Sequence, residues 1–299
     1  MIYTVTLNPA VDYNITLPAL KSGEINRATD ENFHFGGKGV NLSLMLTRLG
    51  VENVAAGFIA GFSGKAIEED LKQNRVKTDF YKVDGTTRVN IKIKNGETET
   101  EINGAGPTVT LKDVTLLMDA ICEKSPKYVC LCGSLPPSLP SDTYKHMVSR
   151  FSEKGINTVV DTSGIALRHA VSASPFLIKP NLAELCYLAG TKLKTTADVQ
   201  KAAENLQKLG ARNILISMGS YGAIFLDEKG KFYSQPAPKI KAVNTVGSGD
   251  SLLAGFLSRY ILKDVRSAIK MGVAAGSATA QTDGLATYSQ IMQIFNDKS

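Results

Sequence analysis

The sequence predicts an α/β fold, in which a mainly parallel sheet is covered by helices on both faces, and three observations indicate it. Short apolar, β-branched runs alternate with longer segments of helical periodicity along most of the chain. Two other stretches alternate polar and apolar residues with a period of two. The 299 residues are 43% hydrophobic and 21% charged, which excludes a disordered chain and supplies a large core.

The β-branched runs give the strands in chain order. A buried parallel strand reads as a nearly continuous apolar run because helices cover both faces of the sheet. We expect strands at Ile2–Leu7, Val54–Ile59, Tyr128–Leu131, Thr158–Asp161, Phe176–Ile178, Asn213–Met218 and Ala223–Leu226.

Segments with a period near 3.6 residues lie between and after these strands and predict helices. We expect them at Val40–Leu49, Lys65–Gln73, Leu111–Glu123, Ser141–Glu153, Ala183–Ala189, Val199–Leu209, Gly247–Ile261, Val265–Ala280 and Tyr288–Phe295.

The two period-two stretches indicate a small antiparallel sheet made from separate parts of the chain. One is Val11–Leu17, and the other begins at Arg88 and turns at Asn95-Gly96, a strong hairpin signal. A β layer inserted at about 11–34 and 86–103 is a candidate lid over a site, and an ordinary surface hairpin is the alternative. We therefore expect one α/β domain over residues 1–299 with an inserted lid, not two domains.

Charge and cysteine usage narrow the possible partners. The net charge is +6, but the basic residues are spread along the chain, so charge alone leaves open nucleic acid, an anionic membrane or anionic small molecules. No apolar run approaches the length of a membrane helix, and the first residues lack a signal-peptide pattern. The four cysteines show no metal or redox spacing, which favours free thiols in the cytoplasm.

The most informative segment runs from Asn244 through Gly247, Ser248 and Gly249 to Asp250 and enters an apolar helix. Glycines at a helix start let free N–H groups face an anion, and Asp250 is the one side chain there that can accept a proton. Transfer of a phosphoryl group from ATP to a hydroxyl needs such a cradle. A glycine turn with a helix-capping Asp is the alternative.

Two further segments carry possible ligand contacts. Gly36, Gly37, Lys38 and Asn41 open an earlier helix, where the backbone can approach a ligand, although a hinge with a solvated lysine would look the same. Asp12 follows the first strand, where α/β sheets place ligand contacts.

A third group follows the predicted strand Phe176–Ile178. Lys179 and Asn181 precede Glu184, a carboxylate that can hold Mg²⁺ through water, although helix capping explains the same residues. Ser217, Gly219 and Gly222 form a tight turn suited to a nucleotide. The P-loop and dinucleotide fingerprints are absent from the sequence.

The order of these pieces resembles the ribokinase-like sugar kinases of the phosphofructokinase B family over essentially the whole chain. The segment Thr4–Asp12 resembles the phosphosugar branch of that family, and Gly85–Lys92 and Thr100–Pro107 are most similar to bacterial 1-phosphofructokinases. The resemblance implies a three-layer α/β/α body with a β lid, which often pairs with a second lid to make a homodimer.

The resemblance also implies roles for the residues and the ligands. Asp250 would take the proton of the sugar hydroxyl, and the N–H groups of Gly247, Ser248 and Gly249 would stabilise the developing charge. The phosphosugar would be held by Asp12, Arg27, Gly36, Gly37, Lys38, Asn41 and Arg88. ATP would be held by Lys179, Asn181, Glu184, Ser217, Gly219, Gly222 and Thr245, with Asn181 and Glu184 organising Mg²⁺.

The implied reaction is ATP-dependent phosphorylation of fructose 1-phosphate to fructose 1,6-bisphosphate. Tagatose 6-phosphate and fructose 6-phosphate are the alternative substrates, and a regulator that binds nucleotide or sugar phosphate without turnover is the alternative from another class. Asn244 replaces an Asp common in the family, which removes a carboxylate linked to monovalent-cation activation. Because Asp250 lies at a helix N-terminus, we expect its pKa to be lowered.

Overall fold

A nine-stranded sheet runs through the protein, and the computed structural model describes residues 1–96 and 98–297. Its strands lie in the order β13-β12-β11-β10-β9-β8-β1-β4-β5, and all pairs from β11 to β5 are parallel. Only β12 and β13 are antiparallel to their neighbours. The bounds are β1 (Ile2–Thr6), β4 (Asn53–Ile59), β5 (Lys77–Lys82), β8 (Tyr128–Cys132), β9 (Asn157–Asp161), β10 (Leu177–Ile178), β11 (Asn213–Ser217), β12 (Ala223–Leu226) and β13 (Phe232–Gln235).

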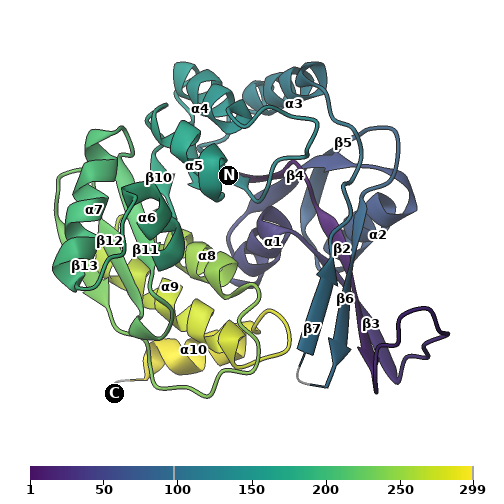
Figure 1. Cartoon of the computed structure of the whole chain (residues 1–299). Coiled ribbons are helices and arrows are strands. Elements are labelled where there is room, and N and C mark those ends of the chain that lie inside the picture. The colour runs from purple at the N-terminus through teal and green to yellow at the C-terminus, as the bar shows by residue number, and fades with distance from the viewer. Residues whose placement is uncertain (97, 298–299) are drawn as a thin grey trace.

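Helices cover both faces of this sheet, so the predicted α/β class is confirmed (Figure 1). On one face pack α3 (Leu111–Glu123), α4 (Thr143–Glu153), α5 (Gly164–Val171), α6 (Leu182–Ala189) and α7 (Thr196–Lys208). On the other pack α1 (Lys38–Arg48), α8 (Ser248–Tyr260), α9 (Val265–Ala280) and α10 (Tyr288–Asn296). Within the described residues, no helix has the length and apolar composition needed to cross a membrane.

A second, four-stranded sheet lies beside the body and is built from two separate parts of the chain (Figure 1). Its order is β3-β2-β6-β7, with β2 (Ala10–Leu17), β3 (Asp30–Gly36), β6 (Arg88–Asn95) and β7 (Thr98–Ile102). The hairpin turn predicted at Asn95-Gly96 joins β6 to β7, and Glu97 of that prediction lies outside the described residues.

The second sheet has one polar and one apolar face because its strands alternate. Near the body, Val11, Phe35 and Val89 pack with α1 and with α2 (Gly61–Gln73) in a small core. The opposite face carries Asp12 and Asn90, which are cross-strand partners. This packing leaves the polar face exposed toward the space between the sheet and the body.

Four elements were missed in the sequence for identifiable reasons. The strands β5 and β13 lie at the two edges of the large sheet, where polar residues interrupt the apolar pattern. The strand β3 carries exposed side chains over most of its length, and α5 is only eight residues long. The helix α2 begins at Gly61, four residues before its predicted start. The first turn was not predicted because it contains Gly61 and Gly64, and glycine has a low helix propensity.

Close packing against α9 fixes the position of α8. A Cβ added to Gly255 would lie 2.5 Å from the Met271 carbonyl oxygen, and one added to Gly272 would lie 2.9 Å from that of Leu252. Glycines at these two positions therefore let the backbones approach more closely than any other residue would allow. The start of α8, which carries the most informative sequence motif, is held rigidly by this contact.

Candidate active site

The predicted site residues gather at the carboxyl-terminal edge of the large sheet, where α1 and α8 also begin. Asp161 ends β9 in register with Cys132 of β8, and Lys179 directly follows β10. Lys38 is the first residue of α1, and Gly247 precedes α8 with a φ of 78°, a conformation that favours glycine. Parallel strands thus bring segments far apart in the sequence to one edge.

A buried ion cluster forms the centre of the site. The carboxylate of Asp161 accepts from Lys38 Nζ at 2.9 Å through Oδ1 and contacts Lys179 Nζ at 3.3 Å through Oδ2. Burial by itself would raise the pKa of Asp161, but the charges of Lys179 and Lys38 outweigh it and hold that pKa below its usual range. Burial opposes the charge of Lys38, yet the surrounding carboxylates, Asp161 first among them, raise its pKa. Asp161 and Lys38 therefore stabilise each other in their charged forms.

Asp250 lies in the first turn of α8, next to this cluster. Its side chain is buried, and its Oδ2 accepts a hydrogen bond from Asn41 Nδ2 at 2.8 Å. Burial raises its pKa and the charge of Asp161 raises it further, while Lys38, the Asn41 hydrogen bond and Lys179 offset only part of the effect. The expected lowering by the helix N-terminus is therefore wrong, because desolvation and a like charge outweigh the helix dipole.

The start of α8 presents backbone donors and positive charge. The first N–H groups of a helix have no partner inside it, which makes those of Gly249 and Asp250 available. The Ser248 N–H donates to the Thr245 carbonyl at 3.2 Å, so it is partly engaged within the turn. Lys179 Nζ lies 3.3 Å from where a Cβ on Gly249 would be. An ammonium group beside a helix N-terminus attracts an anion, because its charge adds to that of the free N–H groups.

Asn41 connects this region to the second sheet. Its amide lies 3.8 Å from the Cβ positions that would be added to Gly36 and to Gly247. Gly37, with a φ of 120°, packs on Thr6 and Pro9 at the end of β1. The glycine segment before α1 thus brings the end of β3 and the start of α8 close to one asparagine.

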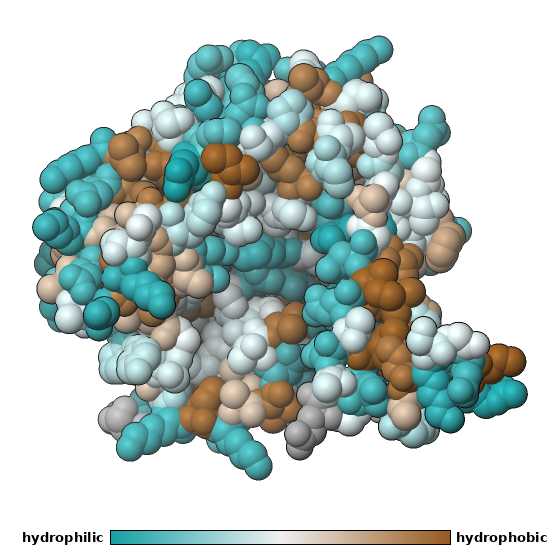
Figure 2. Space-filling model, viewed as in Figure 1, coloured by the Kyte–Doolittle hydropathy of each residue, from teal (hydrophilic) through white to brown (hydrophobic). Residues whose placement is uncertain are grey.

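The polar face of the second sheet carries a second charged group. Asp12 accepts from Asn90 Nδ2 at 2.7 Å and pairs with Lys92 Nζ at 3.2 Å. Arg88 is half-buried and donates through Nε to the Asn8 carbonyl at 3.3 Å. Burial lowers the pKa of Arg88, and Asp12 opposes that effect. Figure 2 shows hydrophilic residues lining the hollow between the body and the second sheet.

Asn181 and Glu184 cap α6. The Asn181 side chain accepts from the Glu184 N–H at 2.8 Å, and Glu184 Oε2 accepts from the Asn181 N–H at 2.9 Å. Glu184 is nevertheless close enough to contribute to the raised pKa of Lys38. The capping alternative is therefore realised, and the carboxylate also faces the charged edge.

The predicted turn after β11 is a single 3₁₀ turn. It spans Gly219–Tyr221, follows Ser217, and ends at Gly222. A Cβ on Gly222 would lie 2.0 Å from the Gln235 carbonyl oxygen, so this position requires glycine. Tyr221 is 76% exposed beside the turn.

Arg27 is the one predicted residue that lies apart from the others. It is exposed in the segment between β2 and β3. Gly36, which pairs with Ala10, lies at the end of β3 that leads directly into α1. Asp30, which pairs with Thr16, lies at the opposite end, and the segment that carries Arg27 joins the sheet there. Within one chain, Arg27 is therefore distant from the cluster around Asp250.

Sequence reasoning missed several residues of the site. Asp161 was included in a strand but not in the site, although a carboxylate closing a buried strand is a usable signal. Asn90 and Lys92 alternate with Arg88 along β6, so period two places all three on one face. Asn8 is buried, and its Oδ1 has no partner within the described residues.

One substitution at each buried aspartate tests the electrostatics, and the two should have opposite effects on stability. Asp161→Asn leaves two lysine charges without their counter-ion and should lower the free energy of unfolding by about 3–5 kcal/mol. A raised pKa in the folded state means that the ionised form of Asp250 is less favourable there than in the unfolded chain. Asp250→Asn should therefore stabilise the protein at pH 7.

Urea unfolding of both variants and of the unsubstituted protein measures the change in the free energy of unfolding that each substitution causes. The variants are matched, since each replaces a buried carboxylate in the same cluster by its amide. A loss of stability in Asp250→Asn comparable to that in Asp161→Asn would contradict the assignment of opposite pKa shifts.

Comparison with known proteins shows the family of this chain. The model of the pfkB family of carbohydrate kinases matches residues 5–291. The chain is 38% identical to the 1-phosphofructokinase of Bacillus subtilis, over 98% of this chain and 97% of that protein. It is 36% identical to the D-tagatose-1-phosphate kinase of Bacillus licheniformis, over 98% and 97% of the two chains.

Solved structures confirm the fold. A putative phosphofructokinase from Staphylococcus aureus superimposes with a TM-score of 0.87 at 38% identity, covering 99% of this chain and 96% of that one. Arabidopsis thaliana ribokinase gives a TM-score of 0.85 at 20% identity, covering 99% of each chain, so the ribokinase-like fold is confirmed. This chain belongs to the pfkB family of carbohydrate kinases, phosphotransferases that use ATP to phosphorylate a sugar hydroxyl.

Proposed function

We propose that the protein transfers the γ-phosphoryl group of ATP to the free primary hydroxyl of fructose 1-phosphate, giving fructose 1,6-bisphosphate and ADP. The observation that carries the proposal is the buried Asp250, which lies at a helix N-terminus beside two lysines and accepts a hydrogen bond from Asn41, a residue that lies close to Gly36 of the second sheet. The 38% identity to a 1-phosphofructokinase supports this substrate over others.

Asp250 is the proposed base. As the oxygen–phosphorus bond to the sugar forms and the bond to ADP breaks, the hydroxyl proton passes to the Asp250 carboxylate. Its raised pKa makes it a better proton acceptor than an exposed aspartate. The hydrogen bond from Asn41 fixes Oδ2, which supports an oriented carboxylate facing the hydroxyl. Orientation matters because phosphoryl transfer depends mainly on positioning and charge stabilisation.

Gly247, Ser248 and Gly249 supply the proposed anion hole. Their N–H groups lie where α8 starts, and Lys179 adds a full positive charge there. Since the Ser248 N–H already contacts Thr245, Gly247 and Gly249 should contribute most. Donors fixed before the reaction stabilise charge that develops on the transferred group without reorganising.

The polar face of the second sheet is the proposed binding surface for the phosphosugar. Arg88 and Lys92 supply positive charge, and Asp12 can accept hydrogen bonds from sugar hydroxyls. Gly36, Gly37 and Lys38 would approach the sugar from the start of α1. Arg27 would reach this phosphate only if the segment that carries it moved or if it came from a second chain.

ATP is the proposed occupant of the edge formed by Lys179, Thr245 and the turn at Ser217, Gly219 and Gly222. Within the described residues there is no group of three or more metal-ligating side chains. This fits Mg²⁺, which usually binds through one or two carboxylates together with phosphates. Glu184, with Asn181 beside it, would hold the ion, which when bound would neutralise charge on the phosphates.

The second sheet is proposed to act as a lid on one domain. It carries sugar-binding groups on its polar face and joins the body through the segments at Gly36–Gly37 and Gly85–Thr87. Closure would exclude water, which otherwise competes with the sugar for the phosphoryl group. The need for ATP and the unpaired thiols support the cytoplasm as the compartment.

Tagatose 6-phosphate and fructose 6-phosphate are the alternative substrates. The similarity to a D-tagatose-1-phosphate kinase makes tagatose 1-phosphate a third. A coupled assay of ADP release across these three phosphosugars and fructose 1-phosphate tests the proposal. We expect the highest kcat/KM with fructose 1-phosphate, because its phosphate would meet Arg88 while its far hydroxyl meets Asp250. A higher kcat/KM with any of the other three phosphosugars would overturn the substrate assignment.

Asp250→Asn separates chemistry from binding. We expect kcat to fall by roughly 10²–10⁴-fold, as for loss of a general base, because the amide cannot accept the proton. The affinity for ATP, measured by calorimetry, should change little because the fold and the lysines remain. Near-normal turnover in this variant would remove Asp250 from the proposed role.

The apolar face of the second sheet supports a homodimer. Phe33, Tyr13, Ile91 and Ile102 are successive cross-strand partners and form one row on this face. Tyr13 and Phe33 stack with ring centroids 4.5 Å apart, yet Phe33 is 56% and Ile102 is 55% exposed. Figure 2 shows hydrophobic residues gathered over this sheet. A second copy of the same face would bury the row.

Sedimentation velocity tests the dimer. Phe33→Glu should convert the protein to a monomer, because a charge would be buried against a second apolar row. Leu209→Glu, which changes a residue 64% exposed at the end of α7, is the control and should leave the assembly unchanged. A dimer that persists in Phe33→Glu would contradict pairing through this face.

A further inference from the structure

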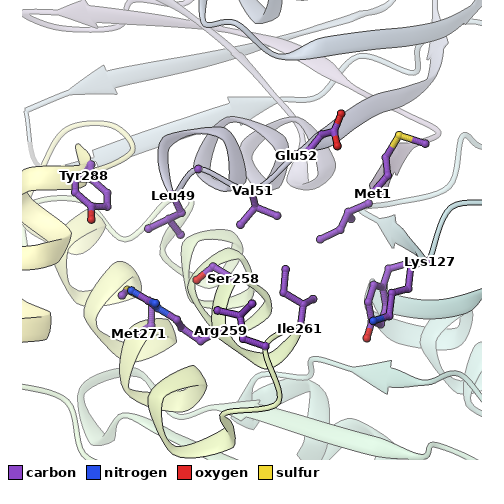
Figure 3. Close-up of a pocket in the computed structure, with 14 residues that line it drawn as sticks. Met1, Leu49, Val51, Glu52, Lys127, Ser258, Arg259, Ile261, Met271 and Tyr288 are labelled. Carbon is purple, nitrogen blue, oxygen red and sulfur yellow. The ribbon is translucent and has the colours of Figure 1, made fainter.

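A pocket lies at the edge of the large sheet opposite the candidate active site. It has a volume of about 480 Å³ and lies where β1, β4 and β8 begin, between the C-terminal ends of α1 and α8 (Figure 3). We propose that this pocket binds a small amphipathic anion, an apolar acid with one carboxylate or sulfonate, and that its occupancy is coupled to the nucleotide site.

The lining is mainly apolar and remains uncovered. Leu49 and Val51 line it from the end of α1, Ile261 from the end of α8, and Met271 from α9. Leu262 and Tyr288 complete it and are 65% and 52% exposed. The volume lies within the range of small-molecule sites and is too small for a helix or strand of a partner.

The charges at the pocket favour an anion. Lys127 and Arg259 line it, and neither forms an ion pair within residues 1–96 and 98–297. The one carboxylate of the lining, Glu52, is neutralised by Lys77 at 2.7 Å. The ammonium of Lys127 and the guanidinium of Arg259 therefore line the pocket with no ion-pair partner within the described residues.

Aromatic rings hold both cations in place. Lys127 Nζ lies 5.6 Å from the ring centroid of Tyr128, and Arg259 Cζ lies 5.8 Å from that of Phe295. Ring contacts position a cation but leave its hydrogen-bond donors free for a ligand. The helix C-termini nearby carry only about half a charge each, and their last carbonyls accept N–H groups of Val51, Ile261 and Leu262. The two full positive charges of Lys127 and Arg259 therefore make the electrostatic potential in the pocket positive.

Two helices connect the pocket to the active site. The helix α1 begins at Lys38 and ends beside Leu49, while α8 begins beside Asp250 and ends beside Ile261. They span about 16 and 20 Å at 1.5 Å per residue, and the Asn41–Asp250 hydrogen bond joins them at the active-site end. A ligand wedged between their other ends would change their separation and so the geometry of that hydrogen bond.

The close contact of α8 with α9 strengthens the link. Gly255 and Gly272 lock the two helices together, and Met271, whose carbonyl oxygen defines that contact, also lines the pocket. A shift of α9 caused by a ligand would therefore carry α8 with it. Packed helices move as units because interiors are too dense to deform locally.

Binding is tested with 8-anilinonaphthalene-1-sulfonate, a fluorescent apolar anion. The Lys127→Gln/Arg259→Gln double variant should weaken its Kd at least about tenfold, equivalent to 1.4 kcal/mol. Lys145→Gln/Lys154→Gln removes the same charge from the other face of the protein and is the matched control, expected to change the Kd less than about twofold. Equal Kd values of the probe for the two double variants would overturn the proposal that it binds in this pocket.

Coupling is tested with a non-hydrolysable ATP analogue, which needs no sugar substrate, so the result rests on the proposed nucleotide site but not on which phosphosugar the protein phosphorylates. Saturating analogue should change the probe's Kd at least about threefold, and by linkage the probe should change the analogue's affinity by the same factor. Both effects should vanish in Lys127→Gln/Arg259→Gln. A probe Kd that the analogue leaves unchanged would overturn the coupling.

Discussion

The salt bridges of Asp161 with Lys38 and Lys179 are the interaction on which the site depends. They fasten the start of α1 and the segment after β10 to the end of β9, and Lys38 lies more than a hundred residues before the other two in sequence. Removing water from three charges is costly, and only their mutual attraction offsets that cost. The result is a pair of fixed positive charges at the edge where a phosphoryl group would be transferred, and a negative charge that disfavours ionisation of its neighbour Asp250.

The two sheets carry separate sets of charged groups. The large parallel sheet supplies a rigid edge with fixed charges, which suits nucleotide phosphates. The polar face of the second sheet carries a separate set of charged groups, and Asn41 lies between the two. This division supports a reaction in which the nucleotide binds to a fixed surface while the sugar is brought to it by a smaller, movable layer.

Much of the fold could be predicted from the sequence because apolar periodicity reports burial directly. The strand Ile2–Thr6 and the helix Val265–Ala280 were predicted almost to the residue, since burial is nearly complete along both. The edge strands β5 and β13 were missed because burial is partial there. In the site, the glycine motifs and Asp250 were found from local pattern, but Asp161 was not. Its partners come from distant segments, and only the fold brings them together. The pKa of Asp250 was mispredicted for the same reason, because its burial and its distance from Asp161 are tertiary properties.

Asp250 is a buried carboxylate whose surroundings raise its proton affinity, which suits its proposed role as base. This property can be tested by titrating the Asp250 side-chain carboxyl by ¹³C NMR in the free protein, with the signal assigned by the Asp250→Asn variant. We expect a midpoint above the ordinary aspartate value of 3.8. A midpoint at or below 3.8 would contradict it, since the helix N-terminus and the lysines would then dominate over burial and Asp161.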